Sequence, residues 1–261
     1  MRKMTFLAAI LFLISCPLVF AAPHNGWSQT NVPILETGQQ SYVDLFFGNH
    51  SDNHTSYRID RKWELKDSKV EVLNPAGEII DITNQFYYMG ELEEVDQERI
   101  GVNNYYTGSF RTTANGAYII AAEGNFTYGD QTQPTLRSAK SFVGASKIPT
   151  FKEARKITGF DRHITPDRAE LVPLFNPSAL KPGEKVTAQL LLMGRPVPDI
   201  EVAVIRRSDS SDLLMRTDRE GKVTWTAEKP DYYLVRAEIE AQKHNLNNYD
   251  YEATMTYIVQ H

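Results

Sequence analysis

The dominant pattern along the chain alternates apolar and polar residues with a period of two, which is typical of β-strands with one buried face. In the first half it runs from Val43 to Phe47 and appears again at Val70 and Val72. Turn-forming residues follow from Asn74 to Gly77, and a short apolar run then covers residues 79–82. The first half is therefore predicted to consist of strands joined by tight turns.

The second half shows the same alternation more clearly. Its alternating apolar positions lie in Val186 to Leu192, Ile200 to Val204, Val223 to Trp225, Tyr233 to Ile239 and Tyr251 to Tyr257. We expect tight hairpin turns at Gly194-Arg195-Pro196 and at Asp218 to Gly221, because glycine accepts a positive φ at low cost. So many short strands predict an immunoglobulin-like or transthyretin-like sandwich.

Residues 149–168 interrupt the alternation with prolines, a glycine and charged side chains. We therefore predict an all-β protein with two consecutive β-sandwich domains, at residues 22–148 and 169–261, joined by this linker. Inside the linker, the helical spacing of Phe151, Ala154 and Ile157 predicts one short helix over part of the segment.

The amino terminus indicates where the protein works. Arg2 and Lys3 precede an apolar run that ends in small residues at Ala21 and Ala22, which is the pattern of a secretory signal peptide over residues 1–21. A transmembrane anchor is one alternative, and a lipoprotein signal acylated at Cys16 is another. We expect a periplasmic protein, with a lipid anchor through Cys16 as the alternative location.

Composition narrows the classes of function. Without Arg2 and Lys3, acidic side chains outnumber basic ones by about seven, which disfavours nucleic acid as a partner. Cys16 is the only cysteine, so the chain beyond the signal peptide has no thiol nucleophile and no cysteine metal ligand. The sequence lacks the motifs of serine hydrolases, zincins and nucleotide-binding enzymes, and we predict that the protein is not an enzyme.

Several stretches are similar to a known family. Leu171 to Glu184, Gly194 to Pro196, Thr217 to Val223 and Tyr232 to Ala237 resemble domain-of-unknown-function family 4198 (DUF4198), as do His24-Asn25-Gly26-Trp27 and Gly48-Asn49-His50. The resemblance implies an exported bacterial protein of a kind often labelled as an accessory factor for nickel or cobalt uptake. Asn49 separates a glycine and a histidine that are adjacent in the family, which leaves the placement of His50 open.

The histidines are the candidate metal ligands, because a neutral imidazole suits borderline ions such as Ni²⁺ and Co²⁺. His50 and His54 lie four residues apart in a predicted polar loop, His24 lies close after the predicted cleavage site, and His244 follows a predicted strand. Pro23 has no amide proton, which disfavours the square-planar site that an amino terminus with a third-position histidine can form. The alternative is a solvated loop whose histidines contact only water.

Two hypotheses for function follow. The first is an accessory protein that binds Ni²⁺ or Co²⁺ through His24, His50, His54 and His244 and assists its uptake, with a membrane metal permease or another envelope protein as partner. The second is a non-catalytic envelope module that binds a glycan or a protein. Neighbouring aromatic residues on a strand, such as Phe86 and Tyr87, point to opposite faces, so half of them are expected to be exposed for such binding.

Overall fold

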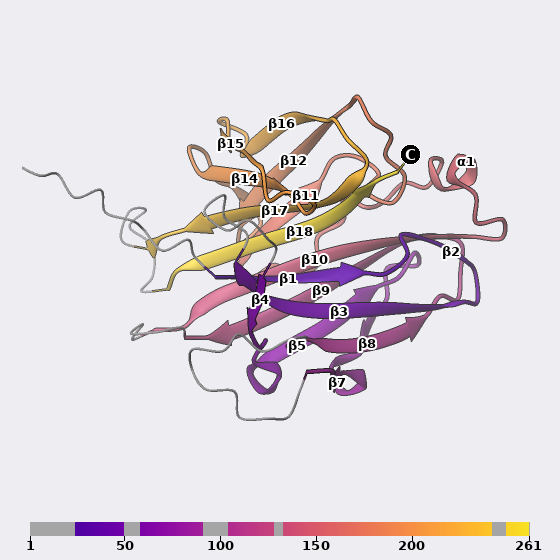
Figure 1. Ribbon diagram of the computed structural model, residues 1–261, viewed down its shortest axis with the longest axis horizontal. Coiled ribbons are helices and arrows are strands. Elements are labelled where there is room, and N and C mark those ends of the chain that lie inside the picture. The colour runs from indigo at the N-terminus through magenta and orange to yellow at the C-terminus, as the bar shows by residue number, and fades with distance from the viewer. Residues whose placement is uncertain (1–23, 50–57, 91–103, 128–132, 242–248, 261) are drawn as a thin grey trace, which may run out of the picture.

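The computed structural model describes residues 24–49, 58–90, 104–127, 133–241 and 249–260, which form an almost entirely β structure (Figure 1). In the first half the strands are β1 (Asn25–Thr30), β2 (Ile34–Glu36), β3 (Gln40–Asn49), β4 (Arg58–Arg61), β5 (Ser68–Leu73), β6 (Ile79–Asp81), β7 (Tyr87–Tyr88), β8 (Tyr106–Arg111), β9 (Gly116–Phe126) and β10 (Thr135–Ser146). In the second half they are β11 (Ala169–Pro173), β12 (Glu184–Leu192), β13 (Arg195–Pro196), β14 (Glu201–Arg206), β15 (Asp212–Arg216), β16 (Lys222–Ala227), β17 (Asp231–Ile239) and β18 (Tyr251–Val259). The predicted all-β class is confirmed.

One nine-stranded sheet, called here the large sheet, runs through both halves of the chain. Its strands follow the order β15-β14-β17-β18-β10-β9-β5-β6, and β2 pairs with the end of β10. The halves join where β10 and β18 lie parallel, with Leu136 opposite Tyr251 and Lys140 opposite Met255. The two-domain division stays a prediction, and the structure adds that strands from both predicted domains share this sheet.

Two smaller sheets cover opposite faces of the large sheet. The amino-terminal sheet has the order β1-β3-β8-β7 with β4 paired to β3, and the carboxyl-terminal sheet has the order β11-β12-β13 with β16 paired to β12. Neighbouring residues of β9 show the layering, since Ile120 packs in one core with Val43 and Ile119 packs in another with Leu171 and Val186. Each core is therefore a sandwich of one small sheet on part of the large one.

The β1 edge of the amino-terminal sheet stands against the face of β18. The hydroxyl of Thr254 donates to the Gly26 carbonyl over 2.7 Å, and the hydroxyl of Thr256 donates to the Ser28 carbonyl over 2.8 Å. Carbonyls that would face solvent at a sheet edge are thus satisfied inside the protein. A third apolar cluster fills the corner beside this junction and contains Trp27, Phe46, Ala203, Ile205 and Leu234.

The predicted turns have the expected chemistry, with one correction. The Asn74 side-chain oxygen accepts from the amides of Ala76 and Glu78, and the hairpin from β12 to β13 contains Gly194 with φ 73°. Gly221 also has a positive φ of 71°. The hairpin expected around it was wrong, because β15 belongs to the large sheet and β16 to the carboxyl-terminal sheet, so the turn crosses between layers.

The segment predicted as a linker packs against the first half. It contains α1 (Phe151–Ala154), which confirms the short helix, and Thr150 caps it by accepting from the Glu153 amide. Arg162 donates to the carbonyls of Asn74 and Ala117, which fixes the segment to the body of the protein. The other helical turns are η1 (Leu65–Asp67) and η2 (Thr83–Gln85), and no helix among the described residues is long and apolar enough to cross a membrane.

Candidate functional site

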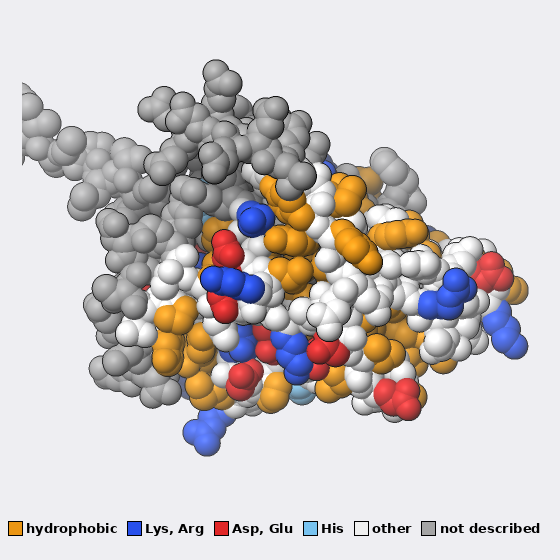
Figure 2. All heavy atoms as spheres, turned by 90° about the horizontal axis from the view of Figure 1, so that it is seen from below, with side chains coloured by type: hydrophobic (Ala, Val, Ile, Leu, Met, Phe, Trp, Pro, Cys, Tyr) orange, Lys and Arg blue, Asp and Glu red, His pale blue; other side chains and the backbone are white. Residues whose placement is uncertain are grey.

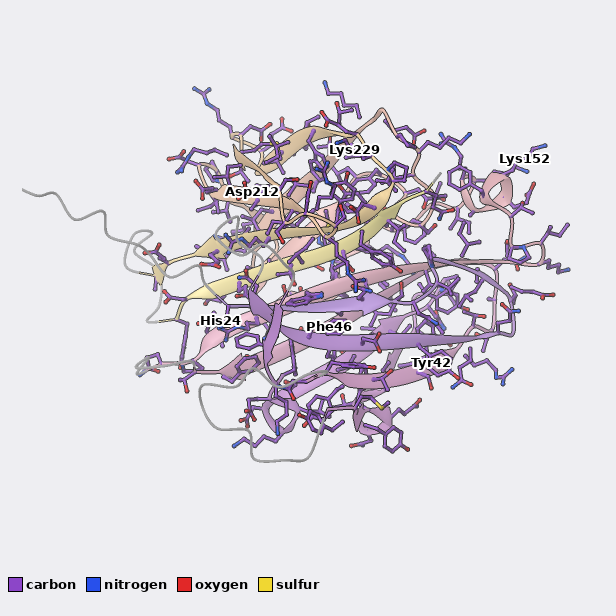
Figure 3. The ribbon with its side chains drawn as sticks, viewed as in Figure 1. His24, Tyr42, Phe46, Lys152, Asp212 and Lys229 are labelled. Carbon is purple, nitrogen blue, oxygen red and sulfur yellow. The ribbon has the colours of Figure 1, made fainter. Side chains whose placement is uncertain are left out.

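His24 lies at one end of the sheets, directly before β1 (Figure 3). It is half-buried, and its ring stacks on Phe47 with the ring centroids 6.1 Å apart and the planes at 28°. In the register of β1 on β3, Asn25 lies opposite Gly48. The residue that ends β3, Asn49, therefore lies beside His24 across the strand pair.

Asn25 connects the start of β1 to the hairpin of β17 and β18. Its side-chain amide donates to Glu238 over 2.9 Å and to Glu252 over 3.1 Å, and these two glutamates lie opposite each other on β17 and β18. The backbone amide of Gly26 donates to the other carboxylate oxygen of Glu252 over 2.8 Å. The side-chain carbonyl oxygen of Asn25 accepts from the Arg236 guanidinium over 2.9 Å. These bonds hold the backbone next to His24 in one position.

A buried charge pair lies beneath this network. Glu252 is almost fully buried, and burial raises the pKa of its carboxyl group, while the nearby Arg137 guanidinium acts in the opposite direction. Arg137 Nε lies 3.5 Å from Glu252 Oε1, and the guanidinium also lies over the rings of Phe126 and Phe47. Phe47 thus contacts both His24 and Arg137, which links the half-buried imidazole to the buried ion pair.

We call this end of the molecule, with His24, Asn25, Asn49, Ala241 and Asp250, the histidine end. His50 and His54 fall within residues 50–57 and His244 within residues 242–248, so these three candidate ligands lie outside the described residues. The described residues contain no cluster of three or more histidine, cysteine, aspartate or glutamate side chains that could hold a metal ion. His24 is the only one of the four predicted ligands that the structure places.

The described strand ends that flank those histidines meet at the histidine end. Segment 50–57 begins after Asn49, next to His24. Segment 242–248 connects Ala241 to the start of β18, and the Ala241 amide donates to the Asp250 carboxylate over 2.9 Å. The end of β3, where segment 50–57 begins, lies on one side of β1. The ends of β17 and β18, which segment 242–248 connects, lie on the other side, because Asn25 bonds to both strands.

Sequence reasoning missed the polar residues of this network. Glu252 and Arg137 fall in strands where alternation assigns polar residues to a solvent face, yet both are buried. An isolated charged residue within a long, otherwise uncharged strand is the sequence signal that could have identified them. In β10 the charged residues are Arg137 and Lys140. His163, in the segment predicted as a linker, is half exposed, and its Nδ1 lies 3.0 Å from a carboxylate oxygen of Glu170.

A second surface of interest is the outer face of the amino-terminal sheet. Asp44 lies opposite Thr107, and Thr107 lies opposite Tyr87, so these three side chains share one face of the sheet. Tyr42 lies on the same face, because it is two residues from Asp44 along β3. Tyr87 is 70% exposed and Tyr42 is 48% exposed, whereas Phe86 is buried, which confirms the expected split of that aromatic pair. Figure 2 views the molecule from the side of β7 and shows hydrophobic side chains grouped between charged ones.

The family model for a domain of unknown function, DUF4198, matches residues 21–241. The chain belongs to the DUF4198 family. The match includes His24, the buried Arg137 and all strands from β1 to β17. It ends before β18, the strand that carries Glu252. No curated protein is significantly similar in sequence to this DUF4198 protein.

Three solved structures with low TM-scores illustrate what this DUF4198 protein is similar to. A DUF4785 family protein from Legionella pneumophila has 11% identity and a TM-score of 0.29, with 80% of this chain and 51% of that one covered. The D0-D1 domain of intimin has 11% identity and a TM-score of 0.22, covering 90% and 100%. A two-domain fibronectin type-III segment of chicken tenascin has 12% identity and a TM-score of 0.24, covering 90% and 97%. The chain spans about half the length of the Legionella protein, and such scores transfer no function.

Proposed function

We propose that this DUF4198 protein is an exported, non-enzymatic accessory protein that captures a transition metal ion, Ni²⁺ or Co²⁺, at the histidine end. The ligands are His24, His50, His54 and His244, and the captured ion passes to a membrane uptake system. One observation carries the proposal. The described strand ends that flank the three other histidines converge on the segment that holds His24.

Covalent reach supports this arrangement. His50 follows Asn49 directly, and consecutive Cα atoms are about 3.8 Å apart. His244 is three residues beyond Ala241, a reach of at most about 11 Å. Both chain segments can therefore bring an imidazole towards His24. Ligands of one ion must place their nitrogens about 2 Å from a common point, and borderline ions accept several imidazoles.

The fixed position of His24 favours binding. Its ring packs on Phe47, and the adjacent backbone is held by Asn25 and Gly26, so less conformational entropy is lost when the ring becomes a ligand. The buried carboxylate of Glu252 is paired with Arg137 and also accepts from the Asn25 side chain and the Gly26 amide, which leaves it as a positioning residue and not a ligand.

Calorimetric titration of the chain from Ala22 onward with Ni²⁺ tests the proposal. We expect one bound ion with a Kd below about 100 μM, and a loss of at least about tenfold in affinity for His24→Ala and for the His50→Ala, His54→Ala double variant. His163→Ala is the matched control, because this imidazole is already bonded to Glu170. Binding weaker than about 100 μM, or equal binding by the double variant, would rule out the metal-capture function.

A second candidate function rests on the exposed tyrosines of the amino-terminal sheet. Tyr42 and Tyr87 share one face and are exposed, so they offer flat apolar surfaces with polar tips for stacking on a sugar or filling a protein interface. This function predicts that a Tyr42→Ser, Tyr87→Ser variant loses retention on envelope glycans or proteins, and that a metal chelator has no effect. A chelator-sensitive retention would favour the metal function instead.

A further inference from the structure

The large sheet ends at β15, which is its edge strand among the described residues (Figure 1). The backbone hydrogen bonds at the two ends of β15 show which of its groups face β14. The Ser211 carbonyl accepts from the Arg206 amide, and the Thr217 amide donates to the Ile200 carbonyl. In this register the odd-numbered residues of β15 direct their backbone amide and carbonyl groups towards β14. In an antiparallel ladder the alternate residues point their amide and carbonyl groups away from the neighbour. The amides and carbonyls of Asp212, Leu214 and Arg216 therefore face outward.

The side chains of this strand are more apolar than is usual for an open edge. Leu213 is 48% exposed and Leu214 is 52% exposed, and they point to opposite faces because they are adjacent on a strand. Open edges in natural proteins are commonly protected by charge, proline or a bulge. Here the centre of the strand carries leucines, with Asp212 at one end and Arg216 at the other.

The charges make the strand complementary to itself. If a second copy pairs antiparallel about a two-fold axis at Leu214, Leu214 lies opposite its own copy and Leu213 lies opposite Met215. The same register places Asp212 opposite Arg216 of the other copy, twice over. All of the outward-facing backbone groups then meet outward-facing groups, which is the condition for ladder hydrogen bonds. Registers centred on Asp212 or Arg216 place like charges together.

We propose that β15 is a self-association edge at which a second copy of this chain adds its own β15 to form a continuous sheet across a two-fold dimer. An interface of this kind is isologous, since the same strand serves on both sides. Arg216 also bonds to Asp199 at the surface, and its guanidinium has donors to spare for the second carboxylate. A single strand pair is a small interface, so the dimer is expected to be weak and to depend on concentration.

The other edge of the large sheet does not share this property. Strand β6 is only Ile79-Ile80-Asp81 and contains no basic residue, so no register of β6 on itself pairs opposite charges within the strand. Ile80 is 40% exposed, and Ile80→Lys therefore serves as the matched control for a charge placed on an open edge.

Sedimentation velocity of the chain from Ala22 onward, from about 5 to about 500 μM, tests the proposal. We expect the wild-type chain to shift from monomer to dimer. Asp212→Arg gives an edge with two positive charges and Arg216→Asp an edge with two negative charges, so each variant alone is expected to weaken association at least tenfold. Their equimolar mixture is expected to recover it, because opposite edges then face each other.

The recovery by mixing separates a charge-paired edge from simple damage to the fold, which mixing cannot repair. Ile80→Lys is expected to associate as the wild-type chain does. A wild-type chain that stays monomeric at about 500 μM overturns the proposal, as does association that survives both single variants or a mixture that stays monomeric. Loss of association in Ile80→Lys also overturns it, because the contact would then involve the β6 edge.

Discussion

The ammonium nitrogen of Lys140 lies 2.6 Å from a carboxylate oxygen of Glu170, and both side chains are almost completely buried. Lys140 comes from β10 of the large sheet and Glu170 from β11 of the carboxyl-terminal sheet, so the pair connects two layers. Burial lowers the pKa of Lys140, and the Glu170 carboxylate counteracts part of that effect. Burial alone would raise the pKa of Glu170, but Lys140, the Ile164 amide and His163 outweigh it and hold that pKa below its usual range.

Lys140→Met is predicted to destabilise the fold strongly. The variant leaves the Glu170 carboxylate buried without its cation, and removal of one partner of a buried pair costs about 3 to 5 kcal/mol. Urea unfolding measures the loss. A Lys140→Met, Glu170→Gln double variant keeps an oxygen acceptor for the Ile164 amide and removes the stranded charge, so it is expected to be more stable than Lys140→Met alone. Equal stability of the two variants would show that the charge pair is not the cause.

Glu252 is predicted to increase the free energy of unfolding as the pH falls. Burial raises the pKa of Glu252, with Arg137 opposing, so the folded state takes up a proton at a pH where the unfolded chain, with a pKa of about 4.3, does not. Between those two pKa values the folded state binds more protons, and stability therefore increases as the pH falls through the folded pKa.

Glu252→Gln is the matched variant for this pH effect, because the neutral amide has no such proton to bind. Urea unfolding at several values between about pH 7 and about pH 4.5 measures both chains. The stability of the wild-type chain relative to the variant is expected to rise towards the lower pH. A difference that stays flat, or that rises with pH, would contradict the raised pKa of Glu252.

Most strands could be predicted from the sequence because the two-residue period is a local signal. Val186 to Leu192 alternates within β12, and the alternation of Tyr233 to Ile239 marks β17 in the same way. The parallel junction of β10 with β18 could not be predicted, since Leu136 and Tyr251 are far apart in sequence and their pairing leaves no local pattern. The layer crossing at Gly221 was missed for the same reason, because a turn sequence does not state which sheet its strands join.

The candidate site was predictable only in part. His24 could be selected by its chemistry. The alternation of Tyr251 and Ala253, in contrast, predicts that Glu252 between them faces solvent. It is buried because β1, from the opposite end of the chain, covers that face and donates the Gly26 amide to it. The metal ligands at His50, His54 and His244 stay predictions.

Gly26→Ala is predicted to destabilise the protein by about 1 to 3 kcal/mol through overpacking. A β-carbon at this position meets the six-membered ring of Trp63, which is fully buried and also lies 3.1 Å from the place of a β-carbon on Gly124. The indole thus fills the space between β1 and β9 that two glycines leave open. Chemical denaturation measures the loss, and Trp63→Phe in the Gly26→Ala background is expected to recover part of it by shortening the ring. Additive losses in the double variant would contradict the contact.

Tyr257→Phe is predicted to cost about 1 to 3 kcal/mol, although it removes only one oxygen. The Tyr257 hydroxyl accepts a buried hydrogen bond from Trp225 Nε1 over 2.8 Å, and its ring stacks on Tyr233 with centroids 5.1 Å apart. Phenylalanine keeps the stacking and leaves the Trp225 N–H buried without this acceptor. Burial raises the pKa of Tyr257, so the hydroxyl stays protonated and the loss is expected to be equal at about pH 6 and about pH 9. Guanidinium unfolding of the single variant and of a Tyr257→Phe, Trp225→Phe double variant gives the coupling energy, and a coupling near zero would contradict the bond.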